Sequence, residues 1–300
     1  MSLTAACRML WYRAVNRAGQ DRQRKRTLYR LKYGGIAEPP AFVGKKAAIS
    51  VRMIHGQPVW ILRPHGTRTE RAILYLPNCP LTGPRKPQLR FALNTARGNH
   101  AEVWLAFSPA DSGSDYLQAL GWSEQVYSEL RKAYHTGMIT VMGEGWGCSL
   151  AVGLMQRTSR RPARLILLSP AAGQEEGLSR EVQLSAARLD PLMTREAVDA
   201  VNTGWAGRLP ADSPFYDPCH ADCSGFPPVL LIHGRRELFY PHVETLRHRL
   251  VESGVQLRTL SKPLWPGWML ARIPESLRAA REIRAWIAGR IATPEASSGT

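Results

Sequence analysis

Continuous apolar runs that alternate with helical patterns constrain the fold of this chain most. From residue 71 onward, runs rich in Val, Ile and Leu alternate with segments whose apolar residues recur at helical spacing. The runs predicted as strands are 71–76, 102–107, 138–142, 164–168, 228–233 and 255–260. Two earlier runs, 48–53 and 58–63, surround a turn signal at residues 55–57 and predict a hairpin. The pattern predicts an α/β fold with a doubly wound, mostly parallel sheet and an antiparallel hairpin at its N-terminal edge.

The stretch 138–155 joins one of these strands to a helix through glycines. A β-branched run leads into Gly143, Gly145 and Gly147, which stand at every second position. A strand, a sharp glycine turn and a helix form a nucleophile elbow, whose middle residue presents a reactive side chain. Here the middle residue is Gly145, which has no side chain. An ordinary glycine-rich turn is the alternative, because glycine spacing is a weak signal.

Composition narrows the class of protein. The 300 residues, 44% hydrophobic, suit one large α/β domain or two small ones. No apolar run approaches the ~20 residues of a membrane helix, and Arg8 and Arg13 interrupt the N-terminal residues, so we expect neither a transmembrane segment nor a secretory signal. The five cysteines lack framework spacing, which favours a reduced, cytoplasmic protein. Cys219-His220 with Cys223 lacks a second pair, so we predict no metal and no cofactor.

Basic side chains are concentrated near the N-terminus. Residues 1–32 hold nine Lys or Arg and a single acid, Asp21. Their net charge, 9 − 1 = +8, is half of the formal net charge of +16. Such a face can attract nucleic acid, anionic lipid or an acidic partner. A solvated arginine-rich helix is favoured instead, since no RNA-binding or helix-turn-helix pattern accompanies the charge. Its apolar side is expected to include Leu3 and Leu10.

Helical patterns fill the segments between the strands. Beyond the basic segment they cover residues 89–96, 123–133, the stretch after the glycine turn to about 157, 242–252 and a last helix from Pro274. Residues 171–215 are more polar and mostly helical, so we interpret them as an insertion into the α/β domain.

Five short motifs occur in one order along the chain. They are the strand at 72–76, G-E-G-W-G-C-S-L-A at 143–151, L-D-P-L-M-T at 189–194, D-S-P-F-Y with S-G-F-P-P between 212 and 228, and W-P-G at 265–267. Together they resemble the hormone-sensitive-lipase-like branch of the α/β-hydrolase fold, the small bacterial carboxylesterases, over about residues 50–292. The resemblance implies an α/β-hydrolase domain at 46–292, a helical cap formed by residues 1–45 and the 171–215 insertion, and a flexible tail at 293–300.

The resemblance also implies a site of four parts: an elbow serine, a histidine after the last strand, a carboxylate after the preceding strand, and backbone N–H donors for an oxyanion. By position, the serine is replaced by Gly145 and the acid is Glu237. The histidine position falls on Met269 or Leu270, with Leu270 favoured. No histidine follows His248, so a small shift in alignment restores none.

The oxyanion positions are altered as well. The family's H-G-G-G loop is replaced by Pro77-Asn78-Cys79-Pro80, in which proline lacks an N–H and glycine's backbone freedom. Trp146 follows the elbow position, where the family usually has alanine. Loss of nucleophile and base together costs a triad roughly 10⁶ in rate. The resemblance with this damage predicts a pseudohydrolase that acts by binding or scaffolding, with a small molecule or a protein as its partner.

Two alternatives stay open. In the first, Cys148 or Ser149 on the first helical turn serves as a displaced nucleophile of an active esterase-type hydrolase or acyltransferase, although no base is placed to match it. In the second, residues 1–32 bind an anionic surface. Because members of the resembled branch often pair through an edge strand, a homodimer is also an expectation.

Overall fold

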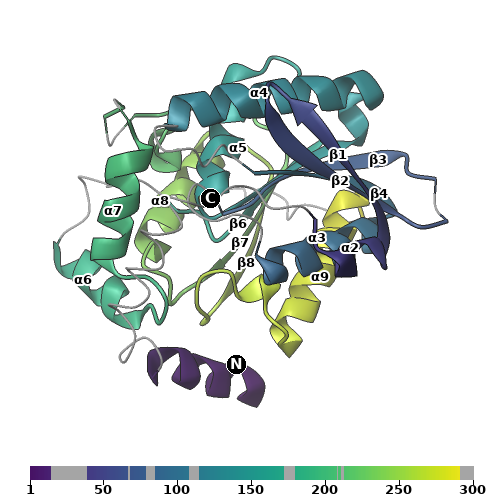
Figure 1. Ribbon diagram of the computed structural model, residues 1–300. Coiled ribbons are helices and arrows are strands. Elements are labelled where there is room, and N and C mark those ends of the chain that lie inside the picture. The colour runs from purple at the N-terminus through teal and green to yellow at the C-terminus, as the bar shows by residue number, and fades with distance from the viewer. Residues whose placement is uncertain are drawn as a thin grey trace.

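A computed structural model describes residues 1–14, 39–66, 68–78, 85–107, 115–171, 180–207, 209–210 and 213–290 (Figure 1). The strands are β1 (Ala47–Ile54), β2 (Gln57–Pro64), β3 (Arg71–Leu76), β4 (Ala101–Ala106), β5 (Ile139–Glu144), β6 (Arg164–Leu168), β7 (Val229–Gly234) and β8 (Leu257–Lys262). The helices are residues 3–14, α2 (Ala41–Gly44), α3 (Lys86–Asn99), α4 (Tyr116–Ala133), α5 (Trp146–Arg157), α6 (Arg180–Leu189), α7 (Arg195–Trp205), α8 (Tyr240–Glu252) and α9 (Pro274–Ile287), with short 3-10 turns η1 (Thr136–Met138), η2 (Pro218–His220) and η3 (Trp268–Leu270).

One eight-stranded sheet runs through the described part of the chain in the order β1-β2-β4-β3-β5-β6-β7-β8. β1 pairs with β2 and β2 with β4 in antiparallel register, and the pairs from β3–β4 to β7–β8 are parallel. The β1–β2 turn places His55 and Gly56 at φ values of 47° and 77°, as a tight two-residue hairpin requires. The predicted mostly parallel sheet with an N-terminal antiparallel hairpin is confirmed.

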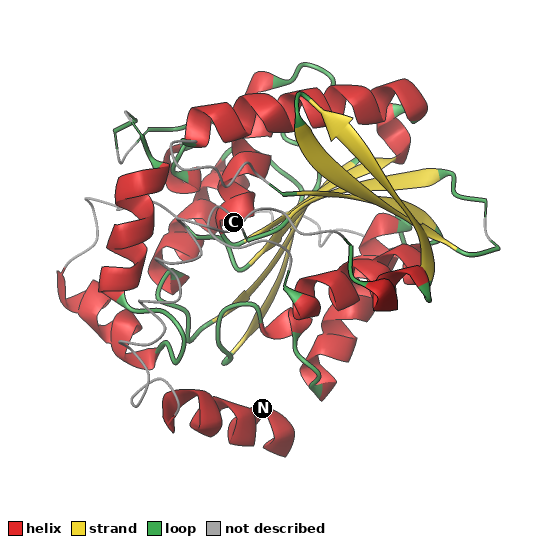
Figure 2. Ribbon diagram, in the orientation of Figure 1, coloured by secondary structure: helices red, strands yellow, loops and turns green. Residues whose placement is uncertain are grey.

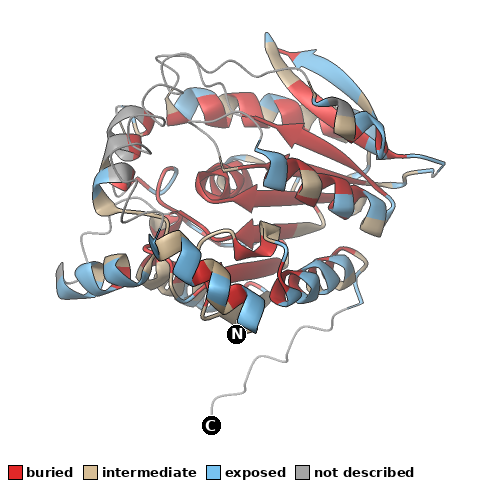
Figure 3. Cartoon of the chain, turned by 60° about the horizontal axis from the view of Figure 1, so that its bottom comes forward, coloured by how far each residue is buried: buried red, intermediate tan, exposed pale blue. Residues whose placement is uncertain are grey.

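Helices cover both faces of this sheet (Figures 1 and 2). α4, α5 and α8 contribute to one hydrophobic core, and α3 and α9 contribute to another on the opposite face. Alternate residues of a strand feed the two cores. In β3, Leu74 and Leu76 belong to the first core, and Ile73 and Tyr75 belong to the second. Burial on both faces explains why the strand runs are continuously apolar, and Figure 3 shows the buried strands between the helical layers.

The N-terminal helix packs through a different face from the one predicted. Ala5 and Met9 are buried in the second core. Leu3 and Leu10, which were expected on the apolar side, are 81% and 62% exposed. Contact with α9 through hydrogen bonds to its first turn fixes which side is covered, and periodicity over one short helix does not reveal that contact. The remainder of the basic segment, residues 15–32, lies outside the described residues.

Part of the predicted insertion is helical, as α6 and α7. Val198, Val201 and Trp205 of α7 are buried in the first core, and the Trp205 ring meets Tyr116 of α4 with centroids 5.9 Å apart. The division at residues 45 and 292 stays a prediction, and the tail at 293–300 lies outside the described residues. Across the described ranges, none of the helices combines the length and apolar composition that crossing a bilayer demands.

Candidate functional site

β5 and α5 meet at a turn centred on Gly145. Its φ and ψ are 58° and −123°, a conformation that residues with a side chain adopt only under strain. The nearby glycines, Gly143 and Gly147, let the backbone of this turn pack closely against other backbone atoms. A Cβ on Gly147 would lie 2.1 Å from the Leu76 carbonyl oxygen. A Cβ on Gly143 would lie 2.6 Å from the Cys148 Cα. The backbone therefore has the tight strand–turn–helix form of a nucleophile elbow, although its central residue carries no reactive group.

The side chain of Asn78 occupies the space above Gly145. A Cβ built on Gly145 would lie 2.4 Å from both Cγ and Oδ1 of Asn78. Asn78 Oδ1 also accepts the backbone N–H of Trp146 at 3.3 Å. In a nucleophile elbow, this is the N–H that points at the oxyanion. An internal amide oxygen is thus bound where the anionic oxygen of an ester-cleavage intermediate would have to be.

Glu144 anchors the segment that carries Asn78. Its Oε2 accepts the Tyr75 hydroxyl at 2.6 Å, the Gln88 side-chain amide at 2.9 Å and the Asn78 backbone N–H at 3.3 Å. Arg85 Nη2 lies 3.9 Å from the other carboxylate oxygen. Because the buried carboxylate is directed at these donors, Glu144 fixes the end of β3 and the start of α3.

Glu237, the carboxylate expected to survive from a triad, is buried and hydrogen-bonded inside the protein. Its Oε1 accepts the Ser169 hydroxyl at 2.7 Å and the Gly234 backbone N–H at 2.6 Å. Burial raises the pKa of Glu237 to about 8, with a further upward contribution from Asp190, although the two hydrogen bonds favour the ionised form. At neutral pH this carboxyl group is therefore mostly protonated.

Ser169 is the partner of Glu237 where a triad would have a histidine. Its hydroxyl donates to Glu237 and accepts the Gly267 backbone N–H at 2.9 Å, and its own φ is 45°. This residue was missed from the sequence. The Ser169-Pro170 pair directly after a strand was the available signal, but spacing does not show that the hydroxyl reaches a residue 68 positions away.

Apolar side chains, Met269 and Leu270, occupy the two positions at which the resemblance places a histidine. Gly267, at a φ of 69°, turns the chain into η3, which ends at Leu270. Trp268 and Met269 of η3 are buried in the second core, and Leu270 is partly buried against it. Neither candidate position therefore offers a group that could accept a proton.

Neither alternative nucleophile faces open space. Cys148 is 0% exposed, its Sγ lies 3.5 Å from the Leu168 carbonyl oxygen, and burial raises the pKa of its thiol well above the ordinary value. Ser149 donates its hydroxyl to the Ala171 carbonyl at 3.1 Å. Among the described residues, neither side chain is hydrogen-bonded to a histidine ring. Both side chains instead contact backbone carbonyl oxygens, which do not act as general bases.

Two other positions that the resemblance assigns to the oxyanion site hold a proline and a bulky ring. Pro77 is buried at the end of β3 and has no N–H to donate. Trp146 is 6% exposed, and its ring packs edge-on against Phe239 with centroids 5.9 Å apart. An indole thus fills space beside the elbow. Cys79 and Pro80 lie outside the described residues.

The cysteines near residue 220 are engaged in local contacts. Cys219 Sγ donates to the His242 carbonyl at 3.0 Å, and His220 Nδ1 lies 3.3 Å from Asp217 Oδ2. Cys223 is buried. Within the described ranges, no three His, Cys, Asp or Glu side chains are grouped so that they could hold a metal ion.

Comparison with known families agrees with this geometry. A family model described as alpha/beta hydrolase fold matches residues 111–263, more than half of the 300 residues. The chain belongs to the α/β-hydrolase fold family. A comparison of this hydrolase-fold chain with curated proteins finds no match.

Solved structures share the hydrolase fold over most of the chain. An esterase candidate from Staphylococcus aureus gives a TM-score of 0.79 at 20% identity, covering 89% of this chain and 92% of its own. EstE5 gives 0.75 at 17% identity, with coverage of 86% and 94%. An esterase of the bacterial hormone-sensitive lipase family gives 0.73 at 20% identity, with coverage of 83% and 88%. The predicted hormone-sensitive-lipase-like fold is confirmed, and at these identities the likeness concerns the fold alone.

Proposed function

We propose that this α/β-hydrolase chain is a pseudohydrolase, which binds or scaffolds a partner and does not cleave esters. The observation that carries the proposal is the position of Asn78. The Asn78 side chain fills the space that a nucleophilic side chain at position 145 would need. Its Oδ1 also accepts the Trp146 backbone N–H, which would otherwise be the oxyanion donor. Acyl transfer needs a nucleophile, a base and free donors in one place.

The state of Glu237 supports the same proposal. In a working triad the carboxylate is ionised, because it orients a histidine and stabilises the imidazolium that forms. Here burial raises the pKa of Glu237 to about 8, and its hydrogen-bond partner is the Ser169 hydroxyl. A mostly neutral carboxyl group bonded to a hydroxyl suits a structural role.

The alternative function is an active esterase-type hydrolase or acyltransferase that uses Cys148 or Ser149. Burial of Cys148, the raised pKa of its thiol and the bond from Ser149 to a backbone carbonyl weigh against it. Activity from this route would require both the α5 helix start and the Asn78 segment to rearrange.

The partner is proposed to be a small molecule or a protein. Pairing of two copies through an edge strand, which in this sheet is β1 or β8, stays a proposal. Binding of an anionic surface by residues 1–32 also stays a proposal. A reduced, cytoplasmic setting is likewise proposed. It is supported by Cys7, Cys148 and Cys223, which form no disulfide within the described part of the chain.

Hydrolysis of p-nitrophenyl butyrate by the full chain tests the proposal, since this ester has also been soaked into crystals of EstE5. The chain is expected to release p-nitrophenolate no faster than buffer. Saturable turnover that disappears in Cys148→Ala or Ser149→Ala would establish the displaced-nucleophile alternative. Saturable turnover that both variants retain would contradict both functions and direct attention to Ser169.

A further inference from the structure

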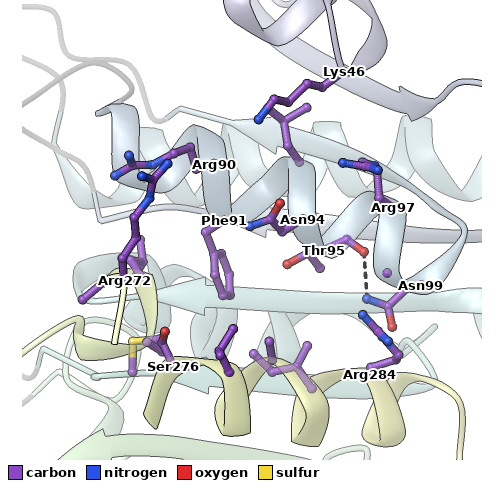
Figure 4. A pocket seen from close by; sticks show the side chains of 18 of the residues that line it. Lys46, Arg90, Phe91, Asn94, Thr95, Arg97, Asn99, Arg272, Ser276 and Arg284 are labelled. Atoms are coloured by element: carbon purple, nitrogen blue, oxygen red, sulfur yellow. Dashed lines mark hydrogen bonds between the residues drawn. The ribbon is translucent and has the colours of Figure 1, made fainter. Parts of the chain in front are cut away.

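A second concave region lies between α3 and α9, on the opposite face of the sheet from α5 (Figure 4). Its volume is about 1220 Å³. The lining also includes the end of η3 and the loop after it, the turn before β1, the turn after β2 and the start of the N-terminal helix. We call it the α3–α9 pocket. Leu270 lines it but Gly145 and Glu237 do not, so a role for this pocket does not depend on the elbow.

Positive charge dominates the lining of the α3–α9 pocket. Six cationic side chains line it: Lys45, Lys46, Arg90, Arg97, Arg272 and Arg284. Its described lining residues include no Asp or Glu. In the described chain, none of the six has a carboxylate oxygen within 4.0 Å. Like charges gathered without counterions repel one another, and a bound anion would offset that repulsion.

The arginines are arranged as two pairs, one toward each end of the pocket. Figure 4 shows Arg90 of α3 and Arg272 toward one end, and Arg97 of α3 and Arg284 of α9 toward the other. Arg284 reaches across to α3, where its Nη2 lies 2.7 Å from the place of a Cβ on Gly98. The two pairs are separated by about 10 Å along α3, at the ordinary rise per helical residue.

Helix-end electrostatics explains only part of this arrangement. Arg97 and Arg284 stand in the last turns of α3 and α9, where a cation offsets the helix dipole. Arg90 lies in the first half of α3, and Arg272 and Lys46 lie outside the helices, so the dipole accounts for none of these three. Their convergence on one concavity calls for a ligand.

We propose that the α3–α9 pocket binds a small molecule that carries two or more phosphate groups. A guanidinium group presents paired N–H donors that match phosphate oxygens. Two arginine pairs about 10 Å apart suit a ligand with anionic groups at both ends. Small-molecule pockets usually measure roughly 300–1,000 Å³, so this one has room for far more than a single phosphate ion. Asn94 of α3 adds a neutral amide to the lining.

Nucleic acid and membrane surfaces fit the pocket less well. Phe91 is the only Phe, Tyr or Trp among its described lining residues, and it is 8% exposed, so unpaired bases would find none of these larger rings open for stacking. The cations line a concavity, whereas a polybasic helix that binds a membrane surface carries them along its exposed polar face. A compact soluble phosphate ester needs no ring for stacking, and it can enter a concavity.

Inositol hexakisphosphate, a compact ring with phosphates on all sides, is a suitable probe. Calorimetric titration of the full chain at about 0.15 M salt is expected to show saturable binding of one probe per chain. The double variants Arg90→Gln/Arg272→Gln and Arg97→Gln/Arg284→Gln are each expected to weaken affinity at least about tenfold, because each removes two charge-assisted contacts.

The matched control is Arg160→Gln/Arg188→Gln, which removes the same charge from exposed positions outside the pocket. It is expected to change affinity less than about twofold at this salt. Equal weakening by all three double variants would show that net charge alone attracts the probe, and would overturn the proposal. So would an absence of saturable binding, or tighter pocket-dependent binding of oligothymidylate or of phosphatidylglycerol vesicles.

Denaturant unfolding of the same variants separates binding from a structural role. Removing unpaired like charges is expected to leave Arg90→Gln/Arg272→Gln as stable as the wild type or more stable. Arg97→Gln/Arg284→Gln is expected to be slightly less stable, because Arg97 and Arg284 also offset helix dipoles. If Arg90→Gln/Arg272→Gln loses stability together with affinity, its arginines support the fold and the proposed site is overturned.

Discussion

Asn78 and residue 145 share a space that holds one side chain. Gly145→Ser would bring a Cβ to 2.4 Å from Asn78 Cγ, at a φ of 58°. We expect the substitution to lower the free energy of unfolding by ~1–3 kcal/mol, through overpacking and backbone strain. In an Asn78→Ala background the same substitution should cost clearly less. Denaturant unfolding of the four members of this double-mutant cycle measures the difference, and additive effects would contradict the shared space.

The buried carboxyl group of Glu237 gives a prediction with a definite sign. Burial raises its pKa from 4.5 to about 8, so the stability that the protonated form provides is complete below about pH 4.5 and is lost as the pH rises through about 8. Glu237→Gln keeps a neutral hydrogen-bonding group that does not titrate. As the pH rises from about 4.5 to about 8, the wild type should lose stability and the variant should not. We therefore expect the variant's unfolding free energy to rise relative to that of the wild type by at least roughly 1 kcal/mol. Urea unfolding at several pH values checks this, and a difference independent of pH would count against a neutral Glu237.

At the residue scale, motifs in the sequence assign expected positions, but they do not reveal contacts between distant residues. The order of the motifs predicted that Gly145, Glu237 and Leu270 would stand at the places of a triad. It did not predict that Asn78 would accept the Trp146 N–H or that Ser169 would bond to Glu237. Both contacts join residues 68 positions apart, and they depend on how separate loops fold over the sheet.

At the scale of elements, the approach of α5 to β3 depends on Gly147. A Cβ there would lie 2.1 Å from the Leu76 carbonyl oxygen, a backbone atom that cannot rotate away. Gly147→Ala is therefore expected to destabilise the protein by at least about 2 kcal/mol. Gly121→Ala in α4, where a Cβ meets nothing within 4 Å, should instead stabilise by about 0.5–1 kcal/mol. Thermal unfolding of the two variants measures both changes in stability. Equal changes would contradict a close contact between Gly147 and the Leu76 carbonyl oxygen.

Element types were predicted better than element ends. The helix expected at 123–133 begins seven residues earlier, at Tyr116. Asp115 accepts the Gln118 N–H and the Gln118 side chain accepts the Asp115 N–H, each at 3.0 Å, which is a capping box that the sequence displays. The N-terminal helix shows the opposite case. Its covered side depends on contact with α9, and no local signal encodes that contact.

At the scale of the whole molecule, the strand and helix alternation was enough to predict the sheet, because covered parallel strands leave few topologies. The distribution of charge was not predictable in the same way. The sequence draws attention to residues 1–32, but the six cations of the α3–α9 pocket come from three separate segments. The folded arrangement of α3, α9 and the turn before β1 brings them to one concavity.

Covalent labelling of the full chain with a fluorophosphonate, followed by intact-mass analysis, tests the central claim most directly. The reagent reports an activated serine nucleophile without requiring a suitable substrate. We predict a mass unchanged by the reagent, since no activated serine lies beside the Trp146 N–H in the described part of the chain. An adduct that maps to Ser149 or Ser169 would contradict the proposal that this chain is a pseudohydrolase.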